Sequence, residues 1–296
     1  MDRFHALLAT WNSFGVPQAI NLTVPFAPDT LWPARFASGL LRGHCDSPDV
    51  LCVQELIGSS ACEFFDGLAS HAHRIRRGGL VFENHGLGVA CRLALERAEE
   101  IRFAARGTGS DALIHKGAMH VRARLTRGPS IDVVTTHLQS GGAPEAAAAR
   151  KLQVAELIAF VNRVADATGP LLVCGDFNID GLDAARAEYV ALAAAMRGAG
   201  LRDLDAVGLR GTSDPTRNDV LREHEPGSKP ERLDYMFLRV PQGDPFDLRV
   251  EAVKLLLDQP LSDIEHSWRA TTGLGGRPFA SDHFGLSVDL SYVPTG

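Results

Sequence analysis

The sequence contains few cysteines, and their number and spacing argue against two classes of protein. Five occur in 296 residues: Cys45, Cys52, Cys62, Cys91 and Cys174. An odd count without closely spaced pairs is typical neither of a structural zinc site nor of a disulfide framework. We therefore expect free thiols, most of them buried.

The sequence also lacks an excess of positive charge. Its formal net charge is −6 and its isoelectric point is near 6.0. These values argue against nucleic-acid binding through a broad basic surface, although they leave room for a local basic groove. Hydrophobic residues make up 45% of the chain, which is enough for a substantial core.

Long apolar runs are absent as well. No stretch approaches the uninterrupted length of a membrane span, so we expect no stable insertion into a membrane. The run Ala6 to Ala9 is too short for a signal peptide, which predicts a cytoplasmic protein. A secreted protein whose signal had been removed would show the same pattern. The sequence specifies no oligomeric state.

The glycines form no nucleotide-binding fingerprint. Gly78 and Gly79 belong to a turn that leads into a predicted hairpin ending near Arg92, not to a strand–turn–helix unit. The chain holds no internal repeat, low-complexity tract or clear linker. Predicted strands outnumber helices, and the helices lie between strands. The sequence therefore predicts one α/β domain over residues 1–296.

Apolar spacing predicts the helices. The strongest runs from Pro144 to Ala167, with proline in its first turn and an inward stripe that includes Leu157 and Val161. Shorter helices are predicted at Arg35 to Arg42 (Leu40 and Leu41 inward), Ala61 to Ala72 (Cys62, Phe65, Leu68 and Ala69 inward), and Leu182 to Met196. A strand pair is predicted over Ala112 to Val121, and loops over Val16 to Pro33, Gly211 to Pro230 and Trp268 to Phe279.

One buried strand ends in a polar pair. Leu171 to Cys174 is a short apolar run bounded by glycine and proline, which is typical of a strand buried on both faces. Because strand side chains alternate, Asp176 and Asn178 are expected to project to the same side. An Asp/Asn turn that simply ends the strand explains the pair equally well when it is taken alone.

Other predicted strands also end or begin with polar side chains. Each has an ordinary explanation: a turn-forming Asn, a solvated carboxylate or lysine, or a structural histidine. Their number favours a common site. The set comprises Asn12, Glu55, His137, Asp176, Asn178, Asp234, Asp282 and His283.

This set of residue types has a chemical logic. Carboxylate oxygens without cysteine suit a hard divalent cation such as Mg²⁺, with Mn²⁺ or another divalent ion as an alternative. Two carboxylates about 4 Å apart would repel by ~4 kcal/mol at an effective dielectric constant near 20, which an ion between them would relieve. Histidine can bind a phosphate oxygen or act as a base near neutral pH. The set therefore fits attack of water on a phosphoester.

The same residues lie in motifs that resemble the endonuclease/exonuclease/phosphatase superfamily. The motifs occur in the family's order over nearly the whole chain, and the fourth and last are the most specific. They are Thr10-Trp11-Asn12, Val53-Gln54-Glu55-Leu56, Thr136-His137-Leu138, Gly175-Asp176-Phe177-Asn178, Arg232-Leu233-Asp234-Tyr235 and Ser281-Asp282-His283-Phe284-Gly285-Leu286. The resemblance implies a four-layer sandwich, in which two packed mixed β-sheets are flanked by helices, with a metal-dependent phosphoesterase site at one rim.

The resemblance also implies roles for individual residues. Glu55 resembles the principal metal carboxylate, assisted by Asn12 and by Asp282. The catalytic set implied is His283, Asp176, Asn178, His137 and Asp234, in which Asp234 orients the ring of His283. Phosphate contacts are implied for His137, Asn178, His283 and Lys116. The resemblance leaves open whether Asp176 or His283 is the base.

Within the superfamily, several segments look most like the neutral sphingomyelinases. They are Thr136 to Ser140, the Lys116-Gly117 step, Ser281 to Leu286, Gly15-Val16-Pro17 and Arg35. This likeness implies that the substrate is a phospholipid-type phosphodiester. Specifically, it implies hydrolysis of sphingomyelin to ceramide and phosphocholine. A nuclease or a phosphatase for a soluble phosphate ester is the alternative, and a catalytically silent binding module is a third.

Overall fold

Two six-stranded mixed β-sheets form the centre of the molecule in a computed structural model that describes residues 3–16, 33–77, 84–183, 186–204, 211–241, 243, 246–272 and 275–293. The first sheet has the strand order β11 (Arg249–Leu256), β12 (Gly285–Tyr292), β1 (Phe4–Gly15), β2 (Val50–Leu56), β4 (Gly88–Cys91), β3 (His73–Arg76). The second has the order β5 (Ala94–Arg102), β6 (Gly117–Arg124), β7 (Ser130–His137), β8 (Leu171–Asp176), β10 (Asp234–Arg239), β9 (Arg202–Asp203). We call them sheet A and sheet B.

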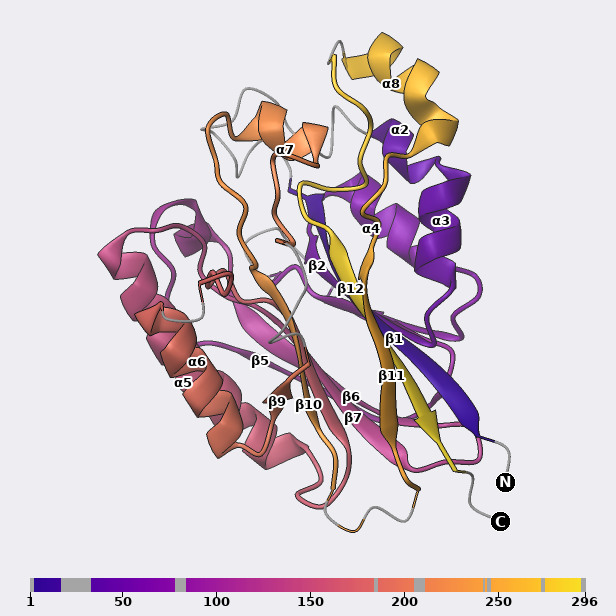
Figure 1. Ribbon diagram of the computed structural model, residues 1–296, viewed down its shortest axis with the longest axis vertical. Coiled ribbons are helices and arrows are strands. Elements are labelled where there is room, and N and C mark those ends of the chain that lie inside the picture. The colour runs from indigo at the N-terminus through magenta and orange to yellow at the C-terminus, as the bar shows by residue number, and fades with distance from the viewer. Residues whose placement is uncertain are drawn as a thin grey trace.

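Helices cover the outer faces of the two sheets, so the expected four-layer sandwich is confirmed (Figure 1). Helices α5 (Pro144–Val164) and α6 (Ala187–Gly198) pack on sheet B. The outer face of sheet A carries α2 (Pro33–Phe36), α3 (Gly39–Asp46), α4 (Ser59–Asp66) and the short helix η3 (Ser262–Ile264). The remaining helices are η2 (Gly109–Leu113), α7 (Asp219–His224) and α8 (Glu265–Thr272).

Strand β8 shows how the central strands are stabilised. Leu172 and Cys174 face sheet A and belong to the core between the sheets, whereas Leu171 and Val173 pack beneath α5 and α6. All four are fully buried. The short apolar run therefore forms a strand buried on both faces, as the sequence predicts.

Strand register brings the polar strand ends together. Strands β7 and β8 are parallel, and His137 lies opposite Asp176. Strand β10 runs antiparallel to β8, so Asp234 at its start also lies opposite Asp176. Strands β1 and β2 are parallel in sheet A, which brings Asn12 beside Gln54 and therefore next to Glu55. Helix α7 lies near this end of the strands, and both termini lie near the other (Figure 1).

The predicted long helix is confirmed, although it ends at Val164 rather than Ala167 because Ala165 is extended, and three shorter helix predictions need correction. Ser38 divides the helix predicted over Arg35 to Arg42 because its hydroxyl caps the next helix, α3; Leu40 is then exposed and only Leu41 faces inward. Helix α4 ends at Asp66, before Leu68, because Gly67 closes its last turn. Its predicted inward residues differ too: Cys62 is half-buried, and Ala69 lies beyond the helix and is exposed.

The predicted start of the helix at Leu182 is also wrong. Helix α6 begins at Ala187. Leu182 lies in a bend before it, and the amide of Leu182 donates a hydrogen bond to the Asp180 carboxylate. The predicted strand pair at Ala112 to Val121 is instead the helical turn η2 followed by strand β6.

Two predicted loops contain helices. Asn218 accepts hydrogen bonds from the amides of Val220 and Leu221 and so starts α7 within the Gly211 to Pro230 stretch. Trp268 lies on α8 and is buried. The predicted turn at residues 78–82 and most of the loop from Val16 to Pro33 lie outside the described residues.

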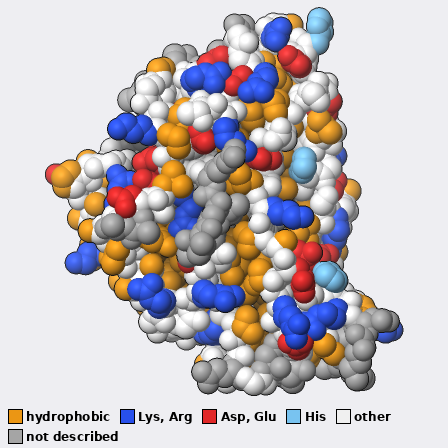
Figure 2. Space-filling view, in the orientation of Figure 1, with side chains coloured by type: hydrophobic (Ala, Val, Ile, Leu, Met, Phe, Trp, Pro, Cys, Tyr) orange, Lys and Arg blue, Asp and Glu red, His pale blue; other side chains and the backbone are white. Residues whose placement is uncertain are grey.

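The described residues contain no helix long and apolar enough to cross a membrane. The five cysteines are free thiols, and all except the half-buried Cys62 are buried, as expected. On the face seen in Figure 2, Lys and Arg side chains are interspersed with Asp and Glu side chains.

Candidate active site

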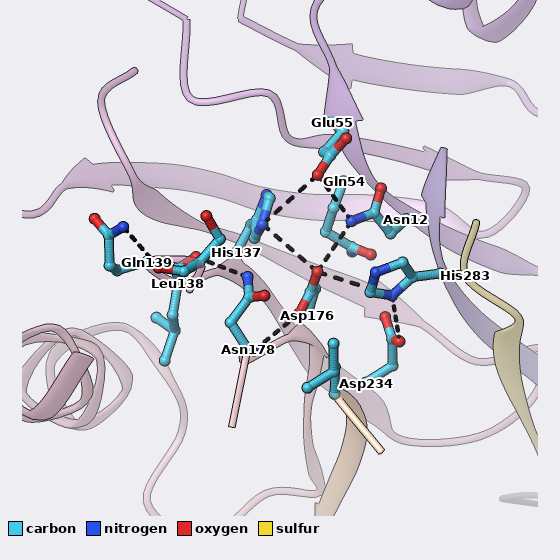
Figure 3. Close-up of polar contacts among 12 residues, drawn as sticks. Asn12, Gln54, Glu55, His137, Leu138, Gln139, Asp176, Asn178, Asp234 and His283 are labelled. Atoms are coloured by element: carbon cyan, nitrogen blue, oxygen red, sulfur yellow. Dashed lines mark hydrogen bonds and ion pairs between the residues drawn. The ribbon is translucent and has the colours of Figure 1, made fainter. Parts of the chain in front are cut away.

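The eight polar residues marked by the sequence meet where the ends of strands from both sheets face each other. Figure 3 labels all of them except Asp282. A cleft of about 680 Å³ opens there. Six of the eight line it: Glu55, His137, Asp176, Asn178, Asp282 and His283, together with Lys116. The other two, Asn12 and Asp234, are buried beside the cleft and hydrogen-bond to residues that line it.

Asp176 is the centre of this polar group. Its Oδ2 accepts a hydrogen bond from Asn12 Nδ2 at 3.0 Å and lies 3.5 Å from His137 Nε2. Asn12 belongs to sheet A and Asp176 to sheet B, so this bond joins the two sheets. Asp176 is 1% exposed. Its carboxylate is therefore fixed in place but still borders the cleft.

Asn178 reaches the cleft by a different route from strand alternation. Strand β8 ends at Asp176, and Asn178 has a left-handed backbone with φ of 52°. Its amide donates to Asp176 Oδ1 at 2.9 Å, and its side-chain nitrogen donates to the Leu138 carbonyl at 3.1 Å. An Asx turn therefore places the pair together. Asp176 and Asn178 therefore lie together as expected, but a turn after the strand brings them together rather than the alternation of side chains along it.

Glu55 carries an uncompensated carboxylate. Oε1 accepts a hydrogen bond from Asn12 Nδ2 at 3.1 Å, whereas Oε2 is buried and has no hydrogen-bond partner among the described residues. Burial and the nearby charge of Asp282 raise the pKa of Glu55 to about 7, against the opposing effects of Lys116, Asn12 and His283. The backbone of Glu55 is left-handed, with φ of 54°. Such strain is uncommon and tends to occur at functional sites.

These features test whether the residues fit a divalent ion. An orphaned carboxylate oxygen and a second carboxylate nearby are ligand types that Mg²⁺ prefers. Asn12 points its side-chain nitrogen at Glu55 and its side-chain oxygen at the amide of Phe14, so it orients the Glu55 carboxylate. A cation beside Glu55 and Asp282 would supply the missing positive charge. The residues therefore fit the ion that the sequence suggests.

His283 and Asp234 form a hydrogen-bonded acid–imidazole pair. His283 Nδ1 lies 2.9 Å from Asp234 Oδ2 and 3.9 Å from Asp176 Oδ2. Burial opposes a charge on the ring, but Asp234, Asp176 and Asp282 together outweigh it and raise the pKa of His283 well above its usual value. The ligand atoms of Asp176, Asp234 and His283 lie within 4.8 Å of one another, so this trio could also coordinate a cation. The Nδ1 of His283, however, is already engaged with Asp234.

Asp282 lies next to His283 in the loop before β12 and lines the cleft. Its Oδ1 accepts a hydrogen bond from the Ser281 hydroxyl at 3.0 Å, and Ser281 Oγ accepts one from the amide of His283 at 3.2 Å. Ser281 therefore orients both residues.

His137 and Lys116 contact each other in the cleft, and the sequence does not predict this contact. Lys116 is 4% exposed rather than solvated; its Nζ lies 3.1 Å from His137 Nε2 and 3.4 Å from Asp111 Oδ2. Burial and the charge of Lys116 lower the pKa of His137 to about 3. His137 is therefore neutral at physiological pH.

Sequence reasoning missed the residues that hold the loop after β7. Arg150 donates to the carbonyls of Gln139 and Gly141 and pairs with Glu188, while Gln153 accepts from the amide of Gln139. These are helix residues whose partners are backbone atoms of the preceding loop and, for Arg150, the side chain of Glu188 on the next helix. The apolar periodicity of α5 does not distinguish Arg150 or Gln153 from a polar residue that faces solvent.

Arg35, noted from the sequence as a branch marker, lies outside the cleft. Its buried guanidinium donates to the carbonyls of Phe14 and Ala280, at 2.9 and 2.7 Å. It therefore ties the segment after Asn12 to the segment before Asp282.

Comparisons with known proteins identify the family and the fold. A family model described as the Endonuclease/Exonuclease/phosphatase family matches residues 9–283. No curated protein sequence matches the chain.

Solved structures share the fold at low sequence identity. Sphingomyelinase C from Streptomyces griseocarneus is 19% identical, with a TM-score of 0.67 and coverage of 98% of this chain and 99% of that one. A variant of beta toxin from Staphylococcus aureus with bound magnesium ions is 16% identical, with a TM-score of 0.69 and coverage of 98% and 100%. TDP2 from D. rerio, complexed with a single-strand DNA product, is 20% identical, with a TM-score of 0.69 and coverage of 97% and 98%.

Proposed function

Because this chain belongs to the Endonuclease/Exonuclease/phosphatase family, we propose that it is a divalent-metal-dependent phosphodiesterase. It hydrolyses a phosphoester by attack of water, and its preferred substrate is a sphingomyelin-like phosphodiester, cleaved to ceramide and phosphocholine. The observation that carries this proposal is the hydrogen-bonded Asp234–His283 pair beside Asp176 in the same cleft as Glu55.

The proposed chemistry follows from the protonation of the cleft residues. With its raised pKa, His283 holds a proton near neutral pH, and its ring can donate to a phosphoryl oxygen. Asp176, fixed by Asn12 and by the amide of Asn178, accepts the proton of the attacking water. We thus assign the base to Asp176 and the charged donor to His283.

Three further residues position the phosphate. Neutral His137 and the side chain of Asn178 offer polar contacts at the cleft surface, and Lys116, which lines the cleft beside His137, supplies a positive charge. Together they favour binding of an anionic group between the two sheets.

We propose that Glu55 holds the divalent ion, with Asn12 and Asp282 assisting. Mg²⁺ fits this oxygen set, and Mn²⁺ is the alternative. When bound, such an ion neutralises negative charge on the phosphoryl group and lowers the pKa of water. The magnesium in the related beta toxin fold supports the choice of ion.

The charges that line the cleft favour a phospholipid head group over a nucleic acid strand. Asp180, Glu188, Glu225 and Glu231 line it, and the two arginines of the described lining, Arg150 and Arg186, form ion pairs with Glu188 and Asp180. Burial and the charge of Asp180 raise the pKa of Glu231. These arginines are therefore already paired with acids, whereas binding of a polynucleotide depends on neutralisation of its successive phosphates by Lys and Arg.

The proposed enzymatic activity is tested with bis(p-nitrophenyl) phosphate. We expect hydrolysis that EDTA abolishes and added Mg²⁺ restores, measured by release of nitrophenolate. Hydrolysis that persists in EDTA would contradict metal dependence. A panel of substrates assayed side by side then distinguishes a sphingomyelinase-like enzyme from a nuclease: sphingomyelin vesicles, lysophospholipids, inositol phosphates and plasmid DNA. Plasmid nicking without lipid turnover would favour the nuclease.

A further inference from the structure

Thr212 lies between the two halves of the acid–imidazole pair, although no motif marks it. It is fully buried. Its hydroxyl oxygen accepts hydrogen bonds from the backbone amides of Leu233 and Asp234, at 3.0 and 3.1 Å. Its carbonyl accepts a hydrogen bond from the amide of Phe284 at 2.7 Å. One residue therefore contacts the backbone of Asp234 and the residue next to His283.

These contacts cross from one sheet to the other. Asp234 begins β10 in sheet B, whereas Phe284 leads into β12 in sheet A. The 2.9 Å separation of His283 Nδ1 and Asp234 Oδ2 therefore depends on how the starts of these two strands are held relative to each other. Thr212 hydrogen-bonds to the backbone at the start of each strand.

The flanking residues fix the segment of Thr212 on the β10 side. Ser213 forms a reciprocal backbone pair with Glu231, with N···O distances of 3.0 and 2.8 Å. A Cβ added to Gly211 would lie 2.8 Å from the Glu231 carbonyl oxygen, so the backbones approach closely there. The segment is therefore a fixed support for Thr212.

The loop that carries His283 is also held by Asn218, which donates to the carbonyl of Ser281 at 2.8 Å, and by Arg35, which donates to that of Ala280. The start of β10 is also held by its pairing with β8 and by the Phe177 amide, which donates to the Leu233 carbonyl at 2.9 Å. Removing the Thr212 hydroxyl would leave the buried amide of Asp234 and the partly buried amide of Leu233 without this acceptor. The change would therefore shift the backbone of Asp234 while these other contacts hold the rest of both segments.

We propose that Thr212 is a positioning residue that sets the Asp234–His283 hydrogen bond across the two sheets. Its role in turnover rests on the proposed phosphodiesterase function. Its role in the geometry of the pair does not, so the two are tested separately.

The first test compares Thr212→Val with Thr212→Ser. Valine keeps the shape but removes the acceptor, and serine keeps the acceptor. With bis(p-nitrophenyl) phosphate and Mg²⁺, we expect valine to lower kcat on the order of 10²-fold, with KM changed by less than about 2-fold, as for a misplaced catalytic group. Serine is expected to keep kcat within about 3-fold of the wild type.

Ser38→Ala is the matched control. The Ser38 hydroxyl is also buried and also accepts a backbone amide hydrogen bond, from Leu41 at 3.1 Å, but Ser38 does not line the cleft. We expect it to lower the melting temperature without changing kcat. All rates are measured well below the lowest melting temperature, so that loss of folded protein does not contribute.

The second test observes the pair directly by proton NMR. The Nδ1 proton that His283 shares with Asp234 should give a low-field resonance, assigned by its loss in His283→Gln. We expect Thr212→Val to shift or broaden this resonance and Thr212→Ser to retain it. This readout needs no hydrolysis, so it holds even if the wild-type protein proves inactive. An unchanged resonance in Thr212→Val, or a serine variant as impaired as the valine variant, would overturn the proposal.

Discussion

At the scale of single residues, the site is marked by buried negative charge that the described residues do not fully compensate. Glu55 Oε2 and Asp234 Oδ1 are both buried without a hydrogen-bond partner among those residues. Leaving such oxygens unpaired is costly, and native proteins seldom tolerate it without a reason. A cation beside Glu55 would provide that reason for its oxygen, and the protonated ring of His283, bonded to the other Asp234 oxygen, offsets the charge of that carboxylate.

Glu55 should make the metal-free protein less stable as the pH rises. Its pKa is about 7 in the folded protein and near 4.5 in the unfolded chain, so the folded state binds the extra proton between these values. The stability that this proton confers is present below pH 4.5 and is lost as the pH rises through 7, by at most about 3 kcal/mol. We expect Glu55→Gln to remove this decline, as measured by urea unfolding in EDTA at a series of pH values.

His137 provides an internal check with the opposite sign. Its pKa is lowered to about 3, so it contributes stability that increases from pH 3 to 6.5 in both proteins. Only the difference between wild type and Glu55→Gln isolates Glu55. Parallel pH profiles for the two proteins would show that its carboxylate is already compensated without metal.

The clustering of the eight polar residues could be predicted because each lies at or near the point where a buried strand begins or ends. Their supports could not. Only the family resemblance singles out Lys116, and nothing in its own sequence context predicts that it is buried against His137 and Asp111. Thr212 lies in a polar stretch without periodicity, and its partners are backbone amides more than twenty residues away. Only the folded chain shows these contacts.

At the scale of elements, strands buried on both faces were predictable and edge strands were not. Strands β2, β8 and β10 are short apolar runs with clear boundaries. Strands β5 and β11 lie at sheet edges and are rich in charged and half-exposed residues, so no run of apolar residues marks them. The start of α7 depends on the side chain of Asn218 rather than on an apolar stripe.

Strand β8 also depends on one glycine. Gly175 has φ of 133°, and a Cβ there would lie 2.1 Å from the carbonyl oxygen of Thr136 on β7. We expect Gly175→Ala to destabilise the protein by about 2 kcal/mol or more, because the added atom must separate β7 from β8 or strain the backbone. Urea unfolding gives the free energy.

Gly198→Ala is the control for this substitution. Gly198 ends α6, and apart from its chain neighbours and the backbone of its own helix, no described atom lies within 4 Å of an added Cβ. We expect unchanged or slightly greater stability, since alanine favours the helix. Equal losses in the two variants would contradict the importance of the close approach at Gly175.

At the scale of the whole molecule, the fold brings together segments from almost the full length of the chain. Asn12 and Glu55 come from sheet A, His137 and Asp176 from sheet B, and His283 from the loop before β12. The parallel pairs β1–β2 and β7–β8 direct their ends to the same edge of the sandwich. Packing of the two sheets on a shared apolar core then fixes the distance between the two halves of the site.

The most direct measurement is a double-mutant cycle between the two sheets, with Glu55→Gln and Asp176→Asn assayed on bis(p-nitrophenyl) phosphate in Mg²⁺. Each single change should lower kcat by roughly 10²–10⁴-fold. If both residues act on one phosphorus centre, the double variant should lose less than about 10-fold more than the worse single variant, because residues that act as a unit are not additive. Losses that multiply, or a single variant with a near-normal rate, would contradict a shared centre.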